Sequence, residues 1–377
     1  MLSCQRARFS LPPDLHYLNC AYMGPSPISV QEAGAAAIRR KGNPSEIVAA
    51  DFFEGSEELR RLFGRLINAD PARVAIIPAV SYGVAIVARN TPLRRGQNIV
   101  ISGEQFPSNV YAWRRAAEKN GVELRVVPRA AGWNARLLAA IDDATAIVAL
   151  PHTHWTDGTK FDLAKIGRAA HARGAAFVVD GTQSVGAMPF DVAEIQPDAL
   201  LCAGYKWLLG PYGLGLAYFS PRYDNGEPLE DNWIARKGSD NFQRLVEYED
   251  EYAPGAIRYD VGERSNFILA AMLAEALKVV LDFQPARIQE YCAALSAGPI
   301  EKARALGFVI EDADARGAHL FGLRTPRGVD LKQLNESLRA RRVFASLRGS
   351  ALRVSPHVYN DERDFEALLQ VLQEVVR

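Results

Sequence analysis

Val178-Val179-Asp180-Gly181-Thr182-Gln183 is the most informative segment of this chain, and Gly204-Tyr205-Lys206-Trp207 follows it downstream. An acid ends the first apolar, β-branched run, and a lysine follows a second apolar run over residues 199–203. If both runs are neighbouring strands of one sheet, the carboxylate of Asp180 and the amine of Lys206 converge at one rim. Taken singly, each residue would more often be an ordinary strand-end acid or surface lysine, so the inference rests on the pair.

A carboxylate and a lysine amine at one rim are the pair that pyridoxal 5'-phosphate (PLP) requires. The amine holds the cofactor's aldehyde as a Schiff base, and the carboxylate keeps the ring nitrogen protonated, so that the ring withdraws electrons from a substrate carbanion. The pair therefore predicts an enzyme that removes the α-proton of an amino acid, with Lys206 as the general base and Asp180 opposite the ring nitrogen.

Length and composition indicate a globular protein of two domains. The chain has 377 residues, more than one core usually supports, and 48% of them are hydrophobic. A net charge of zero gives no support for a nucleic-acid or acidic-membrane partner, and no apolar run approaches the ~20 residues that span a bilayer. The chain begins without the apolar core of a secretory signal, and its four cysteines are scattered. We therefore expect a cytoplasmic enzyme.

Apolar β-rich runs alternate with helical patterns from about residue 70 to residue 220, which predicts a largely parallel α/β sheet. The expected strands are 73–78, 98–102, 124–128, 146–151, 176–180 and 199–203, and the expected helices are 82–89, 110–120, 135–141 and 163–173. Residues 221–255 show no clear period and predict a long excursion, and residues 267–283 predict a strong helix. We expect a large PLP-binding domain over 16–284 and a smaller C-terminal α+β domain over 285–377, against which residues 1–15 pack.

Two further segments follow predicted strands and suit the cofactor. Val80 and Ser81 open a helix whose free N–H groups and positive dipole end could bind a phosphate, with Ser81 as the N-cap. A plain helix cap explains these residues equally well. Phe106 lies just after the strand 98–102 and could stack on the pyridine ring, although a large aromatic is more often a packed core residue.

Four polar residues near the central pair have two interpretations each. Gln183 could donate to the cofactor's phenolate oxygen or cap a loop, and Tyr205 could reach the phosphate or simply pack. His152 and His154 could share a face and bind a metal, but no carboxylate or cysteine pattern joins them. We therefore expect no metal site and a contact of His154 with cofactor or substrate, beside Trp155 in the cavity wall.

Arg353 stands inside an apolar run near the C-terminus. A guanidinium offers a bidentate fork to a carboxylate, and an amino-acid substrate carries one. A salt bridge to a neighbouring acid would explain the residue equally well. We expect residues 221–255 and the N-terminal segment that contains Tyr22 to determine the specificity for the substrate side chain.

With these residues, the chain resembles the class V aminotransferase family of fold type I PLP enzymes, which includes cysteine desulfurases, kynureninases and isopenicillin N epimerase-like proteins. The likeness runs from His16-Tyr17-Leu18-Asn19 to the segment of Arg353. It implies that Lys206 forms the Schiff base, Asp180 holds the pyridinium and Arg353 binds the substrate carboxylate. The same resemblance gives Gln183 the phenolate oxygen and Phe106 the stacking role, and it places Val80, Ser81 and Tyr205 near the phosphate.

The family resemblance also implies a homodimer with the active site at the interface. Ser265 lies in Gly262-Glu263-Arg264-Ser265-Asn266, where a partner subunit usually touches the phosphate. Two features depart from the desulfurase pattern: residues 318–352 contain no cysteine, and His154-Trp155 stands where desulfurases place an asparagine. A persulfide mechanism is therefore not expected.

These observations favour an aminotransferase acting on an amino acid. A PLP-dependent lyase or an epimerase would use the same carbanion and stays open. A non-catalytic PLP-binding protein is disfavoured because a mere binder needs no carboxylate clamp at Arg353. A metal hydrolase built on His152 and His154 lacks a third ligand.

Overall fold

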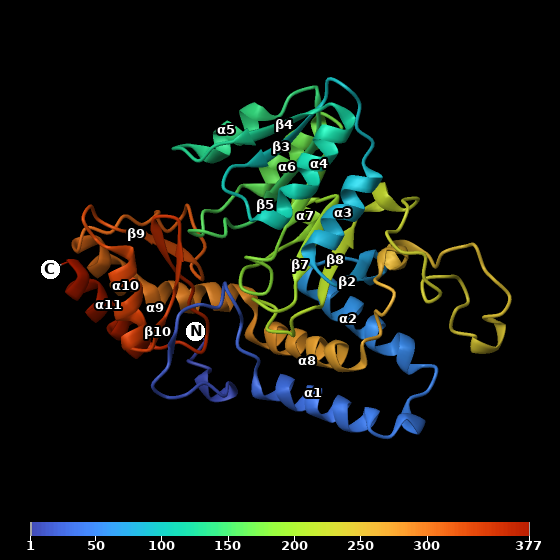
Figure 1. The fold of residues 1–377 in the computed structure, drawn as a ribbon, viewed down its shortest axis with the longest axis horizontal. Helices are drawn as coiled ribbons and strands as arrows, with labels where there is room; N and C mark the ends of the chain where they lie inside the picture. Colours follow the sequence, from blue (N-terminus) through green and yellow to red (C-terminus); the bar gives the residue numbers. More distant parts are fainter. Residues whose placement is uncertain (1, 377) are drawn as a thin grey trace.

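Seven strands form the central sheet of the computed structural model, which describes residues 2–376 (Figure 1). The spatial order is β2-β8-β7-β6-β5-β3-β4, and only β8 runs antiparallel to its neighbours. The strands are β2 (Val74–Ile77), β3 (Asn98–Ser102), β4 (Glu123–Val127), β5 (Thr145–Pro151), β6 (Ala176–Asp180), β7 (Ala199–Ala203) and β8 (Gly215–Phe219). The predicted α/β fold with a mainly parallel sheet is confirmed.

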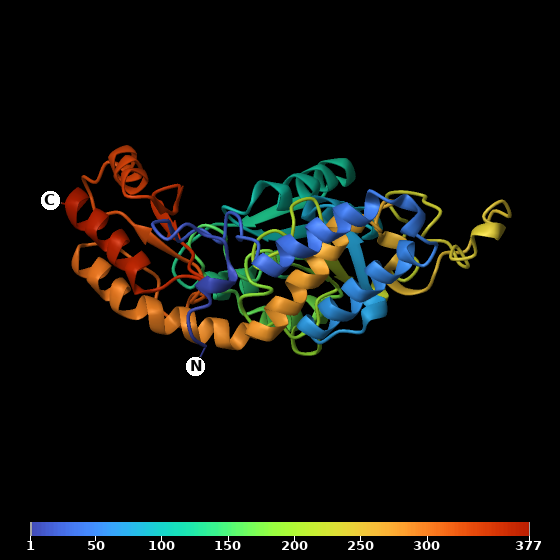
Figure 2. The same ribbon diagram turned by 90° about the horizontal axis from the view of Figure 1, so that it is seen from below.

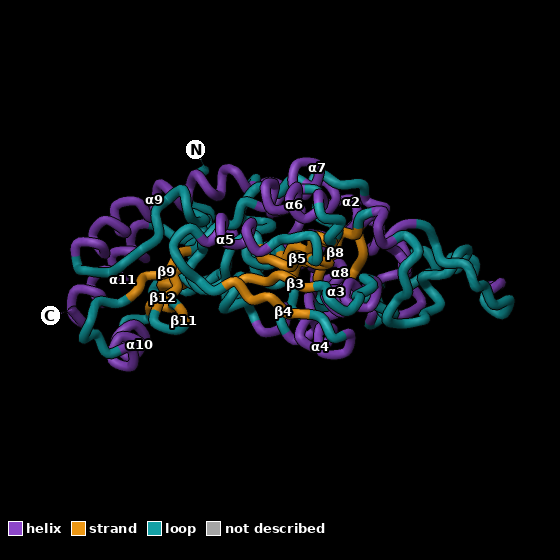
Figure 3. The backbone as a smooth tube through the Cα atoms, turned by 90° about the horizontal axis from the view of Figure 1, so that it is seen from above, coloured by secondary structure: helices purple, strands orange, loops and turns teal. Residues whose placement is uncertain are grey.

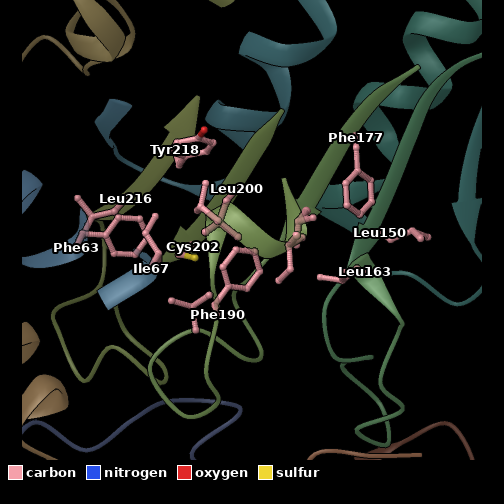
Figure 4. Packing of buried hydrophobic residues seen from close by; sticks show 14 of the residues in the cluster. Phe63, Ile67, Leu150, Leu163, Phe177, Phe190, Leu200, Cys202, Leu216 and Tyr218 are labelled. Atoms are coloured by element: carbon pink, nitrogen blue, oxygen red, sulfur yellow. The ribbon is translucent and has the colours of Figure 1, made fainter. Parts of the chain in front are cut away.

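Helices cover both faces of this sheet, and strands such as β3, β5 and β7 are therefore buried at every residue. Successive side chains of a strand point to opposite faces, so Leu201 of β7 packs with α3 (Val80–Asn90) and α4 (Tyr111–Asn120), whereas Leu200 and Cys202 pack on the other face. That second face carries α2 (Asp51–Ile67), α5 (Trp133–Ala140), α6 (Leu163–Ala172), α7 (Val192–Ile195) and α8 (Phe267–Phe283). Figure 4 shows this packing, with Phe63 and Ile67 of α2 close to Leu216 of β8.

The C-terminal segment forms a lobe of its own beside the large sheet (Figures 1 and 3). Its antiparallel sheet has the order β11-β12-β9, with β9 (Phe321–Arg324), β11 (Ser346–Arg348) and β12 (Ala351–Val354). Around it lie α9 (Pro285–Ala305), α10 (Leu331–Ala340) and α11 (Glu362–Val376), and β1 (His16–Tyr17) pairs with β10 (Val343–Phe344). Figure 2 shows α9 leaving the end of α8 and running along this lobe. The division into domains at residue 284 stays a prediction.

The first residues of the described chain pack against the segments that follow α8. Phe9 stacks edge-on against Tyr359 with ring centroids 5.1 Å apart, and the amide of Gln5 donates to the carbonyl oxygen of Val358 over 2.7 Å. Leu2 and Phe9 share a core cluster with Ile288 and Cys292 of α9.

Residues 221–255 project from the large sheet as the long excursion expected from the sequence (yellow in Figure 1). They contain only short 3-10 helices, η5 (Pro221–Tyr223) and η6 (Phe242–Arg244), and η7 (Gly255–Tyr259) follows them. The remaining 3-10 helices are η1 (Arg6–Arg8), η2 (Pro44–Glu46), η3 (Pro71–Arg73) and η4 (Pro107–Asn109). Within residues 2–376, no helix combines the length and the apolar character needed to cross a membrane.

A buried carboxylate joins α2, β2 and the segment before α8. Asp260 is 1% exposed and accepts hydrogen bonds from Arg60, from Arg264 over 2.6 Å and from the amide of Ile76 over 2.7 Å. Both guanidiniums are also buried; Arg60 has a second ion pair with the half-exposed Glu57 over 3.0 Å, and Asp260 is the buried carboxylate that the two arginines share.

We predict that Asp260→Asn lowers the free energy of unfolding by about 3–5 kcal/mol, because it removes the buried carboxylate that two buried guanidiniums share and leaves Arg60 with the half-exposed Glu57 alone. Urea unfolding followed by circular dichroism measures the change. Asp240→Asn, at an exposed position, is the matched control and should change stability by less than about 0.5 kcal/mol. Equal effects of the two substitutions would show that the Asp260 cluster does not stabilise the fold.

Candidate active site

The ends of β6 and β7 bring the predicted acid and amine to one cavity. Asp180 is the last residue of β6 and pairs with Leu201 of β7, and Lys206 lies three residues beyond the end of β7. Both side chains line a cavity of about 250 Å³ at the carboxyl ends of the parallel strands. The juxtaposition expected from two short sequence segments is therefore present.

Lys206 is 8% exposed, and its amine lies 5.5 Å from the ring centroid of Phe106 and 5.6 Å from that of Tyr205. Burial, reinforced by the positive charge of Arg353, lowers the Lys206 pKa to about 8. A lowered pKa leaves more of the amine unprotonated near neutral pH, as nucleophilic attack on an aldehyde requires.

A glycine of the N-terminal segment lies against the backbone of this lysine. The amide of Gly24 donates to the carbonyl oxygen of Tyr205 over 2.9 Å, and a Cβ at position 24 would lie 2.1 Å from the carbonyl oxygen of Lys206. Only glycine fits this close approach. The contact joins residues far apart in sequence, so no local pattern predicts it.

Burial raises the pKa of Asp180, although the amide of Thr182 donates to its carboxylate over 2.9 Å and Lys206 opposes the shift. A desolvated carboxylate of this kind favours a cationic partner. A protonated ring nitrogen would supply that cation, so Asp180 fits the partner expected for a pyridinium.

The amide group of Gln183 is held in one orientation at the wall of the cavity. Its Nε2 donates to the carbonyl oxygen of Ala21 over 3.1 Å, and its Oε1 accepts from Nε1 of Trp207 over 3.0 Å. One N–H of the amide is left for another acceptor. His319 supports the same residue, since its Nε2 lies 2.7 Å from the Gln183 carbonyl oxygen. The sequence alone did not indicate that Trp207 and His319 support Gln183.

The amino end of α3 opens into the same cavity. Val80 and Ser81 are its first two residues and line the cavity wall. The N-cap is Ala79, without a side-chain cap, which corrects the expectation that Ser81 caps the helix. The amide of Tyr82 already donates to the Ala79 carbonyl oxygen over 3.1 Å, so the N–H groups of Val80 and Ser81 are the ones that can bind an anion such as a phosphate.

Two aromatic side chains form another wall. Phe106 is 40% exposed and meets Trp155 edge-on, with ring centroids 5.5 Å apart. Trp155 donates its Nε1 hydrogen to the carbonyl oxygen of Glu104 over 2.7 Å, which holds its ring in place. Phe106 is therefore not a core residue under a turn and is available for stacking on a flat ligand.

His154 lies away from the cavity, whereas its neighbours Thr153 and Trp155 line it. Its fully buried ring contacts Arg129 and Thr156 through Nδ1, at 3.0 and 2.8 Å, and packs against Trp133. Burial and the charge of Arg129 lower the His154 pKa to about 4. The geometry thus does not bring His154 to the cofactor position, because the chain turns its side chain to the opposite side from its two neighbours.

Of three other residues expected to contact cofactor or substrate, one lines the cavity and two are not among its lining residues. Tyr205 lines it, and Tyr22 is 56% exposed beside the Ala21–Gln183 contact. Ser265 donates to the carbonyl oxygen of Phe52 over 2.6 Å and does not line this cavity, so its phosphate contact in a dimer stays a prediction.

Arg353 occupies the central strand of the C-terminal sheet and is 1% exposed. Its Nη1 donates to the carbonyl oxygen of Trp155 over 2.9 Å, while its Nε and Nη2 are buried without a partner. Burial lowers the Arg353 pKa to about 9. A buried guanidinium with free donors next to the cavity wall is suited to a carboxylate ligand.

Histidines 152 and 154 do not form a metal site in the described structure. His152 lines a separate cavity with Lys160 and Met188. Across residues 2–376, no group of three or more His, Cys, Asp or Glu side chains is arranged to hold a metal ion.

Comparison with known proteins agrees with this geometry. The sequence profile described as "Aminotransferase class-V" matches residues 38–368. Isopenicillin N epimerase of Streptomyces clavuligerus is 26% identical over 97% of this chain and 96% of its own. An uncharacterised aminotransferase of Bacillus subtilis is 26% identical over 82% of this chain and 81% of its own. A solved apo cysteine desulfurase from Thermococcus onnurineus NA1 shares the fold, with a TM-score of 0.87, 20% identity and coverage of 100% and 99% of the two chains.

The profile match spans most of the chain, and the same strand ends that it covers hold the lysine, the acid and the helix amino end of the cavity. The chain belongs to the aminotransferase class-V family and is a PLP-dependent enzyme of fold type I.

Proposed function

We propose that this enzyme transfers the amino group of an amino acid, with PLP attached to Lys206. The observation that carries the proposal is the pair formed by the Lys206 amine, with its lowered pKa, and the buried Asp180 carboxylate on one cavity. The free donors of Arg353 support a substrate that carries a carboxylate.

When bound, PLP supplies an electron sink for the substrate carbanion. The amino end of α3 would hold the phosphate, Asp180 would keep the ring nitrogen protonated, and Phe106 is placed to stack on the ring, since all of them line the cavity. Arg353 orients the substrate through its carboxylate. With its amine free, Lys206 would take the α-proton on Nζ and hold it there, which requires an unprotonated amine at working pH.

An epimerase would return the proton to the α-carbon, and a lyase would expel a side-chain group, so both remain alternatives on the same residues. A persulfide mechanism is less well supported. Cys20 and Cys202 are buried near the cavity, and burial raises the pKa of Cys20 to about 12 and that of Cys202 well above its usual value. Such thiols are poor nucleophiles.

We also propose a cytoplasmic homodimer. All four cysteines are free thiols, as suits a reducing compartment. Ser265 lies away from the cavity of its own subunit, which supports a phosphate contact made across a dimer interface.

The reaction type can be tested in a single turnover. We expect holoenzyme mixed with an excess of a substrate amino acid, and no second substrate, to release about one equivalent of 2-oxo acid per active site. Only transamination has this stoichiometry. Continued loss of optical activity without oxo acid would indicate epimerisation, and continued release of ammonia would indicate elimination. Either result would overturn the aminotransferase proposal.

Asp180→Asn should bind PLP but lose turnover, because an amide cannot hold the ring nitrogen protonated. We expect kcat to fall about 100-fold or more, the scale of a preorganised electrostatic contact. Steady-state kinetics measures kcat, and cofactor content is measured by absorbance. The control is Asp143→Asn, an exposed acid, which should keep wild-type turnover. Near wild-type kcat in Asp180→Asn would exclude Asp180 as the partner of the ring nitrogen.

Attachment of PLP to the apoenzyme should report the Lys206 pKa. Below pH 8 the amine is mostly protonated, so the attachment rate should rise about tenfold per pH unit and level off above about pH 8. Borohydride reduction and peptide mapping measure the label on Lys206, with exposed Lys237 as the unlabelled control.

Arg353→Gln should move the plateau to higher pH, because the Arg353 charge lowers the Lys206 pKa. In the wild type, an attachment rate that keeps rising to about pH 10, as for an ordinary lysine, would contradict the lowered pKa of Lys206. A label on another lysine would contradict the assignment of Lys206 as the attachment site.

A further inference from the structure

A second arginine accompanies Arg353 on the hairpin of β11 and β12. Ser346 of β11 pairs with Arg353, and Arg348 pairs with Ala351. Residues two apart on a strand share a face, so Arg348 projects from the same side of the hairpin as Ser346 and its partner Arg353. Ser346 donates to Oδ1 of Asn19 over 2.8 Å, which ties this face to the N-terminal segment.

Both arginines contact the same residue of the cavity wall. The Arg353 Nη1 donates to the Trp155 carbonyl oxygen over 2.9 Å, and the guanidinium carbon of Arg348 lies 5.6 Å from the centroid of the Trp155 ring. Trp155 lines the cavity that contains Lys206. Arg348 therefore lies beside the same wall of the cavity as Arg353.

Within residues 2–376, neither guanidinium is compensated by a carboxylate. Arg348 is half-buried, its Nη1 donates to the Leu347 carbonyl oxygen over 2.8 Å, and its Nε is buried without a partner. Burial lowers the Arg348 pKa, and Tyr22 is the one group that opposes this shift. By contrast, Arg129 and Arg324 of the neighbouring loops share the carboxylate of Asp157.

The active site thus holds more positive than negative charge. Asp180 is the one carboxylate among the residues that line the cavity, whereas Lys206 lines it and both arginines contact its Trp155 wall. The charges of both arginines help to lower the Lys206 pKa. Partly buried, unpaired charges are costly, and an anionic ligand offsets that cost. One substrate carboxylate satisfies Arg353 and leaves Arg348 free.

We propose that Arg348 binds a second carboxylate, on the side chain of the substrate, so that the enzyme acts on dicarboxylic amino acids. This rests on the proposed function only in assigning the α-carboxylate to Arg353. A fork of N–H donors suits a carboxylate, and the hairpin presents two forks from one face.

Binding of non-reacting acids tests the pair of arginines without turnover. Calorimetry on holoenzyme and apoenzyme compares glutarate with valerate, a monocarboxylate of equal chain length. We expect the wild type to bind glutarate about tenfold or more tightly than valerate, the scale of one charge-assisted hydrogen bond.

Arg348→Gln should remove this preference, and Arg348→Lys should restore part of it. Arg339→Gln, an exposed arginine on α10, should keep it. Equal affinity of the wild type for both acids, or a preference that survives in Arg348→Gln, would overturn the proposal.

Substrate kinetics gives an independent readout. The wild type should favour glutamate, aspartate or 2-aminoadipate over the matching neutral amino acids, such as glutamine and asparagine. Arg348→Gln should raise KM for the acidic substrates about tenfold or more relative to KM for the neutral ones, because the change in the Lys206 pKa affects both kinds of substrate alike whereas the lost carboxylate contact affects only the acidic kind. An equal rise in KM for acidic and neutral substrates would show that Arg348 has only a structural role.

The two proposals fail separately. Turnover of neutral amino acids with no glutarate preference would retain the aminotransferase and overturn the acidic specificity. A glutarate preference without oxo-acid release would do the reverse.

Discussion

The adjacency of β6 and β7 is the constraint on which the chemistry of this fold depends. Parallel neighbours end at one edge, so a carboxylate at the last residue of β6 and an amine just past β7 meet without any specialised loop. The same burial acts oppositely on the two groups, raising the Asp180 pKa and lowering the Lys206 pKa. The raised pKa of Asp180 favours a cationic partner such as a protonated ring nitrogen, and the lowered pKa of Lys206 favours attack on an aldehyde.

The surplus of positive charge links cofactor binding to substrate binding. Arg353 and Arg348 lower the Lys206 pKa, and both retain donors without partners. A substrate carboxylate that pairs with Arg353 removes part of this repulsion and favours the protonated lysine. Lys206 then becomes a stronger base once the substrate is seated, because a base with a higher pKa holds the α-proton more firmly. Substrate binding and proton removal would thereby be coupled through one guanidinium.

Local patterns predicted the elements that carry the central pair, and long-range contacts explain what they missed. The bounds of β3, β6, β7 and α8 agree with the predicted ones because each is an apolar run with clear ends. The antiparallel β8 was not predicted, since the short connection over 204–214 holds no crossover helix to mark it. The helices α1 (Ile28–Lys41) and α2 were also missed. Their burial depends on α8, as the contact between Gly34 and Met272 illustrates.

The site shows the same division. Asp180 ends a strand and Lys206 and Phe106 follow strands, so all three could be located from sequence. Gly24, Trp207 and Arg348 act through partners that only the folded chain brings together. Trp155 joins Phe106 to the two arginines, because its ring lies against Phe106 and Arg348 while its carbonyl oxygen accepts from Arg353. Because Trp155 contacts the central cavity and the C-terminal hairpin at once, it would set the distance between the cofactor and a carboxylate bound to Arg353. Selectivity for the substrate side chain then depends on what the hairpin presents beyond Arg353, and here that is a second guanidinium.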